Sequence, residues 1–318
     1  MKFLIKLGLS LAILFFAFRH VDFAAVIQQF ERLDAVSLIT ALALLTASTL
    51  LAATRWRVIT LETEGKAPNL FFFVRSLYRG AFLNQGLPTT LGGDALRVVD
   101  LSRALGSKRE AFGTVLLDRV IGLSGLLLIN ILMLPLSLQL FPLPLALAVA
   151  GISAGGLIAI AIVLALPWNK LSHHHKVLDL IAELNAFGRR VLAHPRGFLL
   201  QCALSVSVHL CSILAMFVLA RQFGITADLW THLVIQPSVF IAATLPISLA
   251  GWGVREGSMA ALFASIGVAA PAVMATSLTF GVVALITTLP GLIFLLGKSA
   301  RKMDQTTIES SKEIVRES

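Results

Sequence analysis

The segment LPTTLGGDALR, residues 87–97, places a proline, two adjacent glycines and two charged residues inside a strongly apolar chain. A similar segment, LPISLAGWGVR, occurs at residues 245–255, and the two align without a gap at a shift of 158 positions. The correspondence predicts an internal repeat. The matched pairs are Phe82 and Phe240, Leu87 and Leu245, Pro88 and Pro246, Thr90 and Ser248, Leu91 and Leu249, Gly93 and Gly251, Leu96 and Val254, and Arg97 and Arg255.

The composition around these segments is that of a membrane protein. Hydrophobic residues make up 57% of the 318 positions and charged residues 14%, and the mean hydropathy is +0.87. Because one soluble core cannot bury this much apolar surface, the sequence predicts an all-α polytopic membrane protein. Six runs approach or exceed the roughly 18 to 20 residues that cross a bilayer. They are residues 3–18, 36–53, 112–135, 143–166, 197–219 and 271–296.

The basic residues indicate the orientation of the chain in the membrane. The net charge is +9, and 19 of the 26 Lys and Arg residues fall in connections that share one side if the chain starts inside. By the positive-inside rule both termini are then cytoplasmic, in a cell (inner) membrane. The first span lacks a small-residue cleavage site and is read as an uncleaved helix. This topology accounts for the excess of Lys and Arg over Asp and Glu, so we expect no nucleic-acid partner.

Residues 68–105 leave the cytoplasmic side and return to it, with proline and glycine at the turn. Such a segment is typical of a re-entrant helical hairpin, and a second hairpin is predicted at 229–268. Two spans, a hairpin and one span occur twice, at about 1–135 and 143–297, before a short cytoplasmic tail at 298–318. Three full crossings in each unit make the repeats inverted, an arrangement found in many secondary transporters. The alternative is that 229–249 and 254–270 are two ordinary spans.

Two repeated arginines are the leading site candidates. The returning helices should begin near Asp94 and Val254, where free backbone N–H groups attract anions and where Asp94 could cap the helix. Arg97 and Arg255 lie in these first turns, where a cation is unfavourable. The compensating negative charge is either a carboxylate, from Asp94, Asp118 or Glu256, or a ligand phosphate, which a guanidinium binds with a planar fork of donors.

Other charged residues fall inside apolar runs. Arg75 and Arg79 are four apart on one helix face and either bind an anion or extend to the headgroups. Asp118 and Arg119 lie about 12 Å along a helix from Glu110 and point about 100° apart, which favours separate partners and a gating or coupling role.

Several other features have simpler interpretations. The tract His173, His174 and His175 lies in a basic connection, so no metal is expected. His209 is interpreted as a hydrogen-bonded interior histidine, and the RWR motif at 55–57 as an interfacial anchor. No nucleotide loop, zinc-protease pair or nucleophile motif is present, so we expect neither an enzyme nor a cofactor.

The motifs together resemble the lysylphosphatidylglycerol synthase transmembrane family over roughly residues 1–297. The pattern N-x-x-LP-x-x-x-GG-D-x-x-R begins at Asn84, DR-x-x-G follows at Asp118, and G-x-RE follows at Gly253. The best-known members are similar to a flippase that moves an aminoacylated phospholipid between leaflets, with an aminoacyltransferase domain after the membrane region. Other members are associated with polyprenyl-phosphate-linked sugars, glycolipids or hopanoid lipids. The tail at 298–318 has only 21 residues, so we expect no synthase domain.

The resemblance implies a lipid substrate with an anionic headgroup, moved between leaflets by alternating access. The expected headgroup ligands are Arg97, Arg255, Asn84, Thr89, Thr90, Asp94, Ser248, Arg75 and Arg79, with Asp118, Arg119 and Glu256 in gating or proton coupling. The alternatives are a membrane-embedded lipid-modifying transferase and an accessory partner of a glycosyltransferase. Lipid-biosynthetic enzymes are the expected protein partners.

Overall fold

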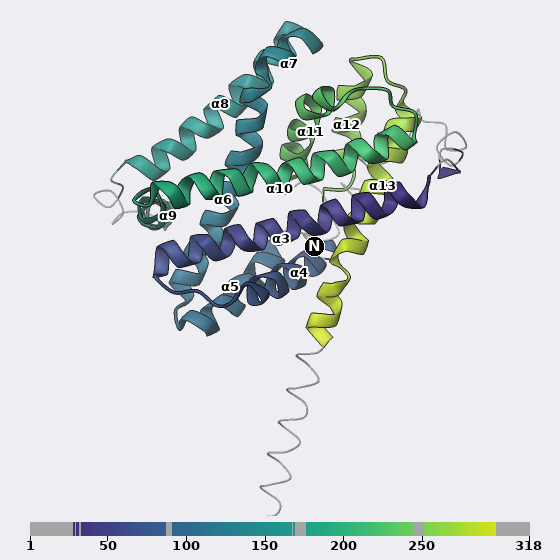
Figure 1. The fold of residues 1–318 in the computed structure, drawn as a ribbon. Helices are drawn as coiled ribbons and strands as arrows, with labels where there is room; N and C mark the ends of the chain where they lie inside the picture. The colour runs from purple at the N-terminus through teal and green to yellow at the C-terminus, as the bar shows by residue number, and fades with distance from the viewer. Residues whose placement is uncertain are drawn as a thin grey trace, which may run out of the picture.

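The computed structural model describes residues 28, 30–31, 33–86, 91–166, 168, 176–244 and 251–296, and every regular element within these ranges is a helix (Figure 1). The predicted first span, the tail 298–318 and the first residues of both repeated segments, 87–90 and 245–250, lie outside the described residues.

Five helices are long and apolar enough to cross a membrane, and they match five of the six predicted spans. They are α3 (Ala35–Glu64), α6 (Lys108–Leu132), α8 (Leu143–Ala165), α10 (Pro195–Gln222) and α13 (Ala270–Thr288), the last continuing to Leu296 after a turn at Leu289. Local signals fix their ends. The Asp34 carboxylate accepts the Ser37 N–H at 2.7 Å at the start of α3, and Gly65, with φ of 68°, ends that helix.

Four shorter helices occupy the positions of the predicted hairpins. They are α4 (Leu70–Gly86), α5 (Leu91–Leu105), α11 (Leu229–Thr244) and α12 (Val254–Ala264). The longest has 17 residues and the shortest 11, which correspond to about 26 Å and 17 Å at 1.5 Å per residue. Each is therefore shorter than the roughly 30 Å hydrocarbon layer.

Each short pair is antiparallel, as the contacts at its two ends show. Gly80 of α4 packs on Gly93 near the start of α5, and Ser76 contacts Asp100 farther along. In α11 and α12, Ala243 meets Gly251 at one end, and the rings of His232 and Phe263 meet at the other, 5.3 Å apart.

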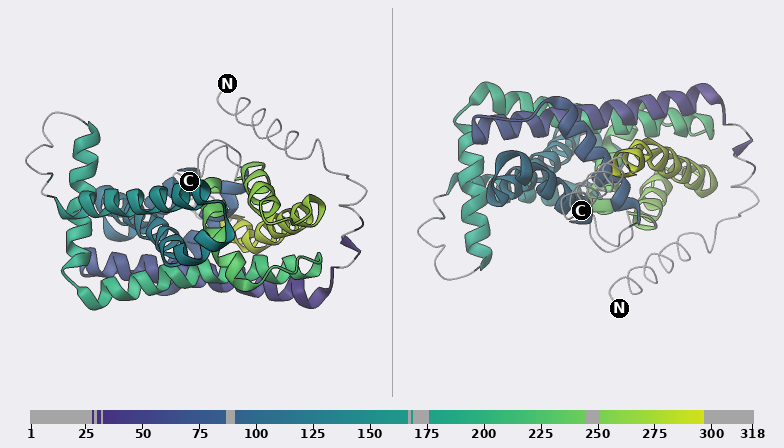
Figure 2. Two further views of the ribbon diagram at one scale, coloured as in Figure 1. Left: turned by 90° about the horizontal axis from the view of Figure 1, so that it is seen from above. Right: turned by 90° about the horizontal axis from the view of Figure 1, so that it is seen from below.

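The helices α3 and α10 form the longest contact in the bundle. They lie side by side in both views of Figure 2 and run in opposite directions, since Ser48 donates to the Val208 carbonyl while Glu62 bonds Gln201. Two helices fall in segments predicted only as connections. These are α7 (Leu134–Leu140) and α9 (Lys176–Leu192), which lies across one end of the bundle.

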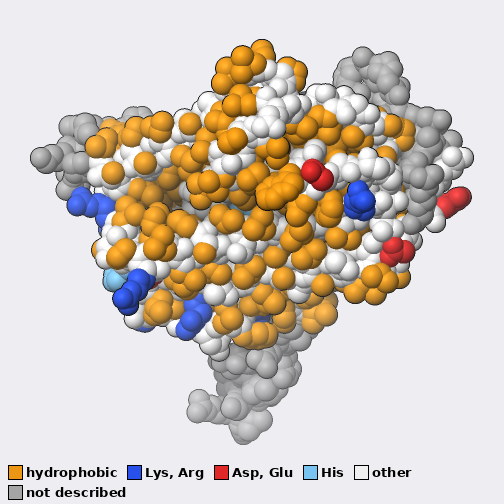
Figure 3. All heavy atoms as spheres, turned by 45° about the horizontal axis from the view of Figure 1, so that its top comes forward, with side chains coloured by type: hydrophobic (Ala, Val, Ile, Leu, Met, Phe, Trp, Pro, Cys, Tyr) orange, Lys and Arg blue, Asp and Glu red, His pale blue; other side chains and the backbone are white. Residues whose placement is uncertain are grey.

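The surface matches a lipid environment between two polar ends. Large apolar side chains are exposed along the long helices, with Val36 74% and Ile293 70% accessible. Lys and Arg gather at the left of Figure 3, the end where α3 finishes and α10 begins, while most of the visible face is hydrophobic. The exposed basic residues at this end include Lys66, Arg103, Lys108, Arg109, Arg189, Arg190 and Arg196.

Candidate functional site

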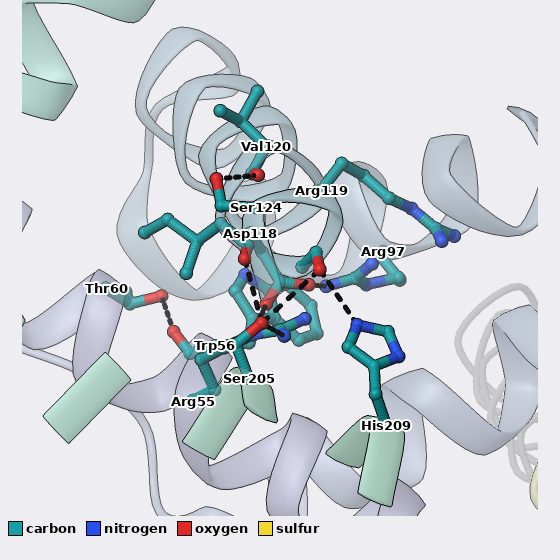
Figure 4. A network of polar contacts seen from close by, with 12 residues as sticks. Arg55, Trp56, Thr60, Arg97, Asp118, Arg119, Val120, Ser124, Ser205 and His209 are labelled. Atoms are coloured by element: carbon teal, nitrogen blue, oxygen red, sulfur yellow. Dashed lines mark hydrogen bonds and ion pairs between the residues drawn. The ribbon is translucent and has the colours of Figure 1, made fainter. Parts of the chain in front are cut away.

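A buried ion-pair network joins the three helices α3, α5 and α6 around Asp118. Its carboxylate accepts Arg55 Nε of α3 at 2.9 Å and Arg97 Nη2 of α5 at 2.6 Å (Figure 4). The side chains of all three residues are 7% accessible or less. Because charge-assisted bonds strengthen where water is excluded, this pairing fixes α3 and α5 against α6.

Arg119 follows Asp118 in sequence but points away from it in Figure 4. Its Nε and Nη2 bind the Asp94 carboxylate, with Nη2 to Oδ1 at 2.7 Å. The prediction that Asp118 and Arg119 have separate partners is thus confirmed. Unlike Asp118, Arg119 is reachable from outside, since 51% of its side chain is accessible.

Arg97 lies in the first two turns of α5 and is compensated by protein. It binds Asp94 at 3.1 Å as well as Asp118, and its guanidinium lies 4.1 Å from the centre of the Trp56 ring. The sequence left open whether a protein carboxylate or a ligand phosphate compensates the charge of Arg97. In the structure, protein carboxylates lie next to it, and the Trp56 ring adds a cation–π contact.

The helix α5 begins three residues earlier than predicted, so Asp94 lies in its first turn and the expected cap is wrong. Asn84 of α4 instead accepts the Gly93 N–H at 2.7 Å. A Cβ on Gly93 would lie 2.3 Å from the Gly80 carbonyl oxygen. Glycine is thus needed here for close backbone packing of α4 on α5.

Hydrogen bonds connect the helix α10 to the network. Arg55 donates to Ser205 Oγ at 3.1 Å, and Ser205 donates to the Ile121 carbonyl at 2.8 Å. His209 Nε2 lies 2.8 Å from the Gly122 carbonyl oxygen, as expected for an interior histidine with a hydrogen bond. Gly122 contacts Arg55 directly, since a Cβ there would lie 3.0 Å from its Nη2.

The interpretation of RWR as an interfacial anchor is wrong for its first two residues. Arg55 is 6% accessible and Trp56 is fully buried, because both face the acid on α6 and the arginine on α5. Their spacing gave no signal for this role, since the end of a span also suits an anchor. The signal that points to Arg55 is indirect: a buried Asp118 requires a cationic partner, and Arg55 is one of the arginines near the end of a span.

A cavity of about 340 Å³ opens beside the network, between α3, α4, α5 and α6. Four of the predicted site residues line it: Asn84, Asp94, Arg97 and Arg119. The remaining lining residues are Ser48, Thr49, Ala52, Leu77, Gly80, Ala81, Gln85 and Gly93. The cavity therefore joins hydroxyl, amide and guanidinium donors, the groups that recognise a phosphate or carboxylate.

Arg255 and Glu256 form a second buried cluster. Arg255 Nη2 binds the Glu256 carboxylate at 2.5 Å, and its Nε donates to Ser277 at 3.0 Å. Glu256, which is fully buried, also accepts the Gly253 N–H at 2.7 Å at the start of α12. The predicted start of this helix at Val254 is confirmed. Among the described residues no hydrogen bond or ion pair links this cluster to the Asp118 network.

The other predicted ligands lie elsewhere. Arg79 is buried and paired with Asp100 of α5, which also accepts a hydrogen bond from Ser76 at 3.2 Å. Arg75 lines a separate cavity at the start of α4. Three predicted ligands, Thr89, Thr90 and Ser248, fall outside the described residues, as does the His173–His175 tract. No group of three metal-ligating side chains occurs in the described part of the chain.

These features define an all-helical membrane protein with several spanning helices and a charged interior. The family model for the lysylphosphatidylglycerol synthase TM region matches residues 3–291. The chain belongs to this family, as its sequence motifs predicted. A search of curated proteins found no match.

Proposed function

We propose that this protein is a flippase that moves an anionic lipid between leaflets, with the headgroup in the cavity beside Asp118. One observation carries the proposal. Among the described residues, the three arginines Arg55, Arg97 and Arg119 are joined to two carboxylates, so the network has a formal excess of one positive charge next to a cavity of about 340 Å³. A membrane interior makes unbalanced charge costly, so an anionic ligand would stabilise this arrangement.

Arg119 is the residue best placed to exchange partners with the lipid. It is half exposed and bound to Asp94, whose own side chain is 17% accessible at the cavity wall. A phosphate entering the cavity can take the place of Asp94 on Arg119, while Arg97 stays fixed by Asp118 and Trp56. Binding of the headgroup would then break the ion pair between Arg119 and Asp94, and its release would restore that ion pair.

The fold supports the arrangement of six spans and two re-entrant hairpins as an inverted repeat. Shifted by 158 positions, Glu64 and Gly86, which end α3 and α4, fall on Gln222 and Thr244, which end α10 and α11. The equivalent helices α3 and α10 run antiparallel, as a twofold axis in the membrane plane requires. The membrane region is then 1–297, with repeats at about 1–135 and 143–297.

The family name refers to a lysylphosphatidylglycerol synthase, which supports a phospholipid or related lipid as the substrate. A transferase activity has less support, because Asp94, Asp118 and Glu256, the carboxylates considered for it, are each engaged in an ion pair with an arginine. We place the protein in the cytoplasmic membrane with both termini inside, since the exposed basic residues gather at one end of the bundle. Lipid-biosynthetic enzymes remain the proposed partners.

Reconstituted vesicles provide the test of this function. The rate at which fluorescent phosphatidylglycerol, a polyprenyl phosphate and phosphatidylcholine become accessible to dithionite would be measured for the wild type and for Arg119→Gln. The control is Arg109→Gln, since Arg109 is 77% accessible and pairs with Glu183 away from the cavity. Losing one charge-assisted hydrogen bond is worth about 1.5–3 kcal/mol, or roughly ten- to a hundredfold in rate.

We expect an anionic lipid to move faster than phosphatidylcholine, and Arg119→Gln alone to slow it at least tenfold. The proposal is wrong if no anionic lipid moves faster than in protein-free vesicles. It is also wrong if Arg119→Gln and Arg109→Gln behave alike.

A further inference from the structure

A second cavity, of about 280 Å³, lies at the start of α4. Pro68, Asn69, Phe71, Phe72 and Arg75 line it. It shares no lining residue with the cavity beside Asp118, and no acidic side chain lines it.

Arg75 has no protein partner among the described residues. No hydrogen bond or ion pair reaches its guanidinium, and its Nε is shielded from solvent without an acceptor. Its neighbour one turn later, Arg79, differs in that its Nη1 forms an ion pair with Asp100. A shielded charged donor without an acceptor is unfavourable, so the site as it stands favours an anion.

A second arginine is bound to a residue that lines this cavity. Arg57 Nε donates to the Pro68 carbonyl oxygen at 3.1 Å, which holds its cationic group next to a lining residue. Lys66 is exposed in the preceding connection. Arg75 is thus the cation that lines the cavity, and Arg57 adds positive charge through its contact with Pro68, at the basic end of the molecule.

The two cavities open on opposite faces of α4. At 100° per residue, Phe71, Phe72 and Arg75 centre on one side of the helix, whereas the five residues of α4 that line the other cavity centre about 160° away. Arg75 therefore does not reach into the cavity beside Asp118, and the two sites are separate.

The surface next to Arg75 is apolar and exposed. Phe71 is 59% accessible and contacts Phe294 of the last helix edge to face, with ring centres 5.9 Å apart. Ile293, on the same segment as Phe294, is 70% accessible. A cationic cavity beside exposed apolar side chains fits an amphiphile, since one part binds phosphate and the other stays in the acyl chains.

We propose that the cavity at the start of α4 binds the phosphate of an anionic phospholipid from the adjoining leaflet, with Arg75 as its direct ligand. Arg57 adds positive charge, and the face of Phe71 and Ile293 carries the acyl chains. This site is distinct from the transport cavity and does not depend on transport activity.

Native mass spectrometry of the detergent-purified protein tests this site. Phosphatidylglycerol would be titrated into the wild type, Arg75→Gln and Arg103→Gln, and phosphatidylcholine and excess inorganic phosphate would be run in parallel. Arg103 is an exposed arginine at the same end that lines neither cavity. Because Arg75 has no internal partner, its replacement should leave the thermal midpoint unchanged. The same titration in an Arg97→Gln background separates this site from the transport cavity.

We expect Arg75→Gln to weaken the binding of one phosphatidylglycerol roughly tenfold or more, in both backgrounds, with Arg103→Gln like the wild type. Phosphatidylcholine should bind more weakly, and inorganic phosphate should not displace the lipid. Equal binding by the wild type and Arg75→Gln overturns the proposal, as does equal binding of the two lipids. Displacement by phosphate assigns the cavity to a free anion instead. Loss of the effect in the Arg97→Gln background shows a single site. Failure of transport alone leaves the lipid-binding result intact.

Discussion

Replacing Asp118 with asparagine removes the charge that holds two buried arginines. The side chain keeps its volume, but Arg55 and Arg97, at 2.9 and 2.6 Å, lose their common carboxylate. The formal charge of the network rises from one positive to two. Removing one partner of a buried ion pair typically costs about 3–5 kcal/mol, because the other charge stays buried and uncompensated. We expect Asp118→Asn to destabilise the protein by this amount.

Asp94→Asn is the matched control. Asp94 is also a carboxylate with two arginine partners, but its side chain is 17% accessible and that of Arg119 is 51% accessible. Water and lipid headgroups can solvate these groups, so the expected loss is about 1 kcal/mol or less. The two variants thus compare the same chemical change at different depths.

The assay is equilibrium unfolding in mixed micelles with a rising fraction of sodium dodecyl sulfate. A double-mutant cycle with Arg55→Gln adds a second test, since removing both partners leaves one less unpaired charge. The double variant should be less destabilised than the sum of the single variants, by about 0.5–3 kcal/mol. The reasoning is refuted if Asp118→Asn costs no more than Asp94→Asn, or if the cycle is additive.

Two further substitutions test the packing and the second cluster. Gly93→Ala places a Cβ 2.3 Å from a carbonyl oxygen and should cost roughly 1–3 kcal/mol by thermal unfolding, whereas Gly155→Ala, with no atom within 4 Å, should be neutral or slightly stabilising. Equal midpoints would contradict the close contact. Glu256→Gln removes both the partner of buried Arg255 and a charged acceptor for the Gly253 N–H, so it should destabilise by about 3–5 kcal/mol in the same micelle assay. A loss below about 1 kcal/mol would show that the Glu256 carboxylate is not needed to compensate Arg255.

The long helices were predictable from the sequence because hydropathy over one span is a local property. Five of the predicted spans match the observed helices, and the helical ends at Asp34 and Gly65 carry ordinary capping residues. The helix α7 was missed because it has only 7 residues, and α9 was missed because it is amphipathic and not continuously apolar, so a search for spans passes over it.

The candidate site was predictable only in part. Asn84, Asp94, Arg97 and Arg119 were named from the motif, and they do line one cavity. Arg55 was not, because its partner lies 63 positions away and its place at the end of a span matched an interfacial anchor.

The sequence by itself determined that this protein lies in a membrane, that it is helical, which family it belongs to and where its repeated segments are. Composition, periodicity and motifs are properties of the linear chain. Only the tertiary structure decided which charge meets which. Asp118 lies between Arg55 and Arg97 because α3, α5 and α6 converge, and Arg75 and Arg97 are separated because they lie on different helices and α4 directs its two cavities to opposite faces. Whether two charges pair depends on differences of a few ångströms in the distance between helices. Helix packing sets these distances, and close glycine contacts, such as that of Gly80 with Gly93, allow the helices to approach.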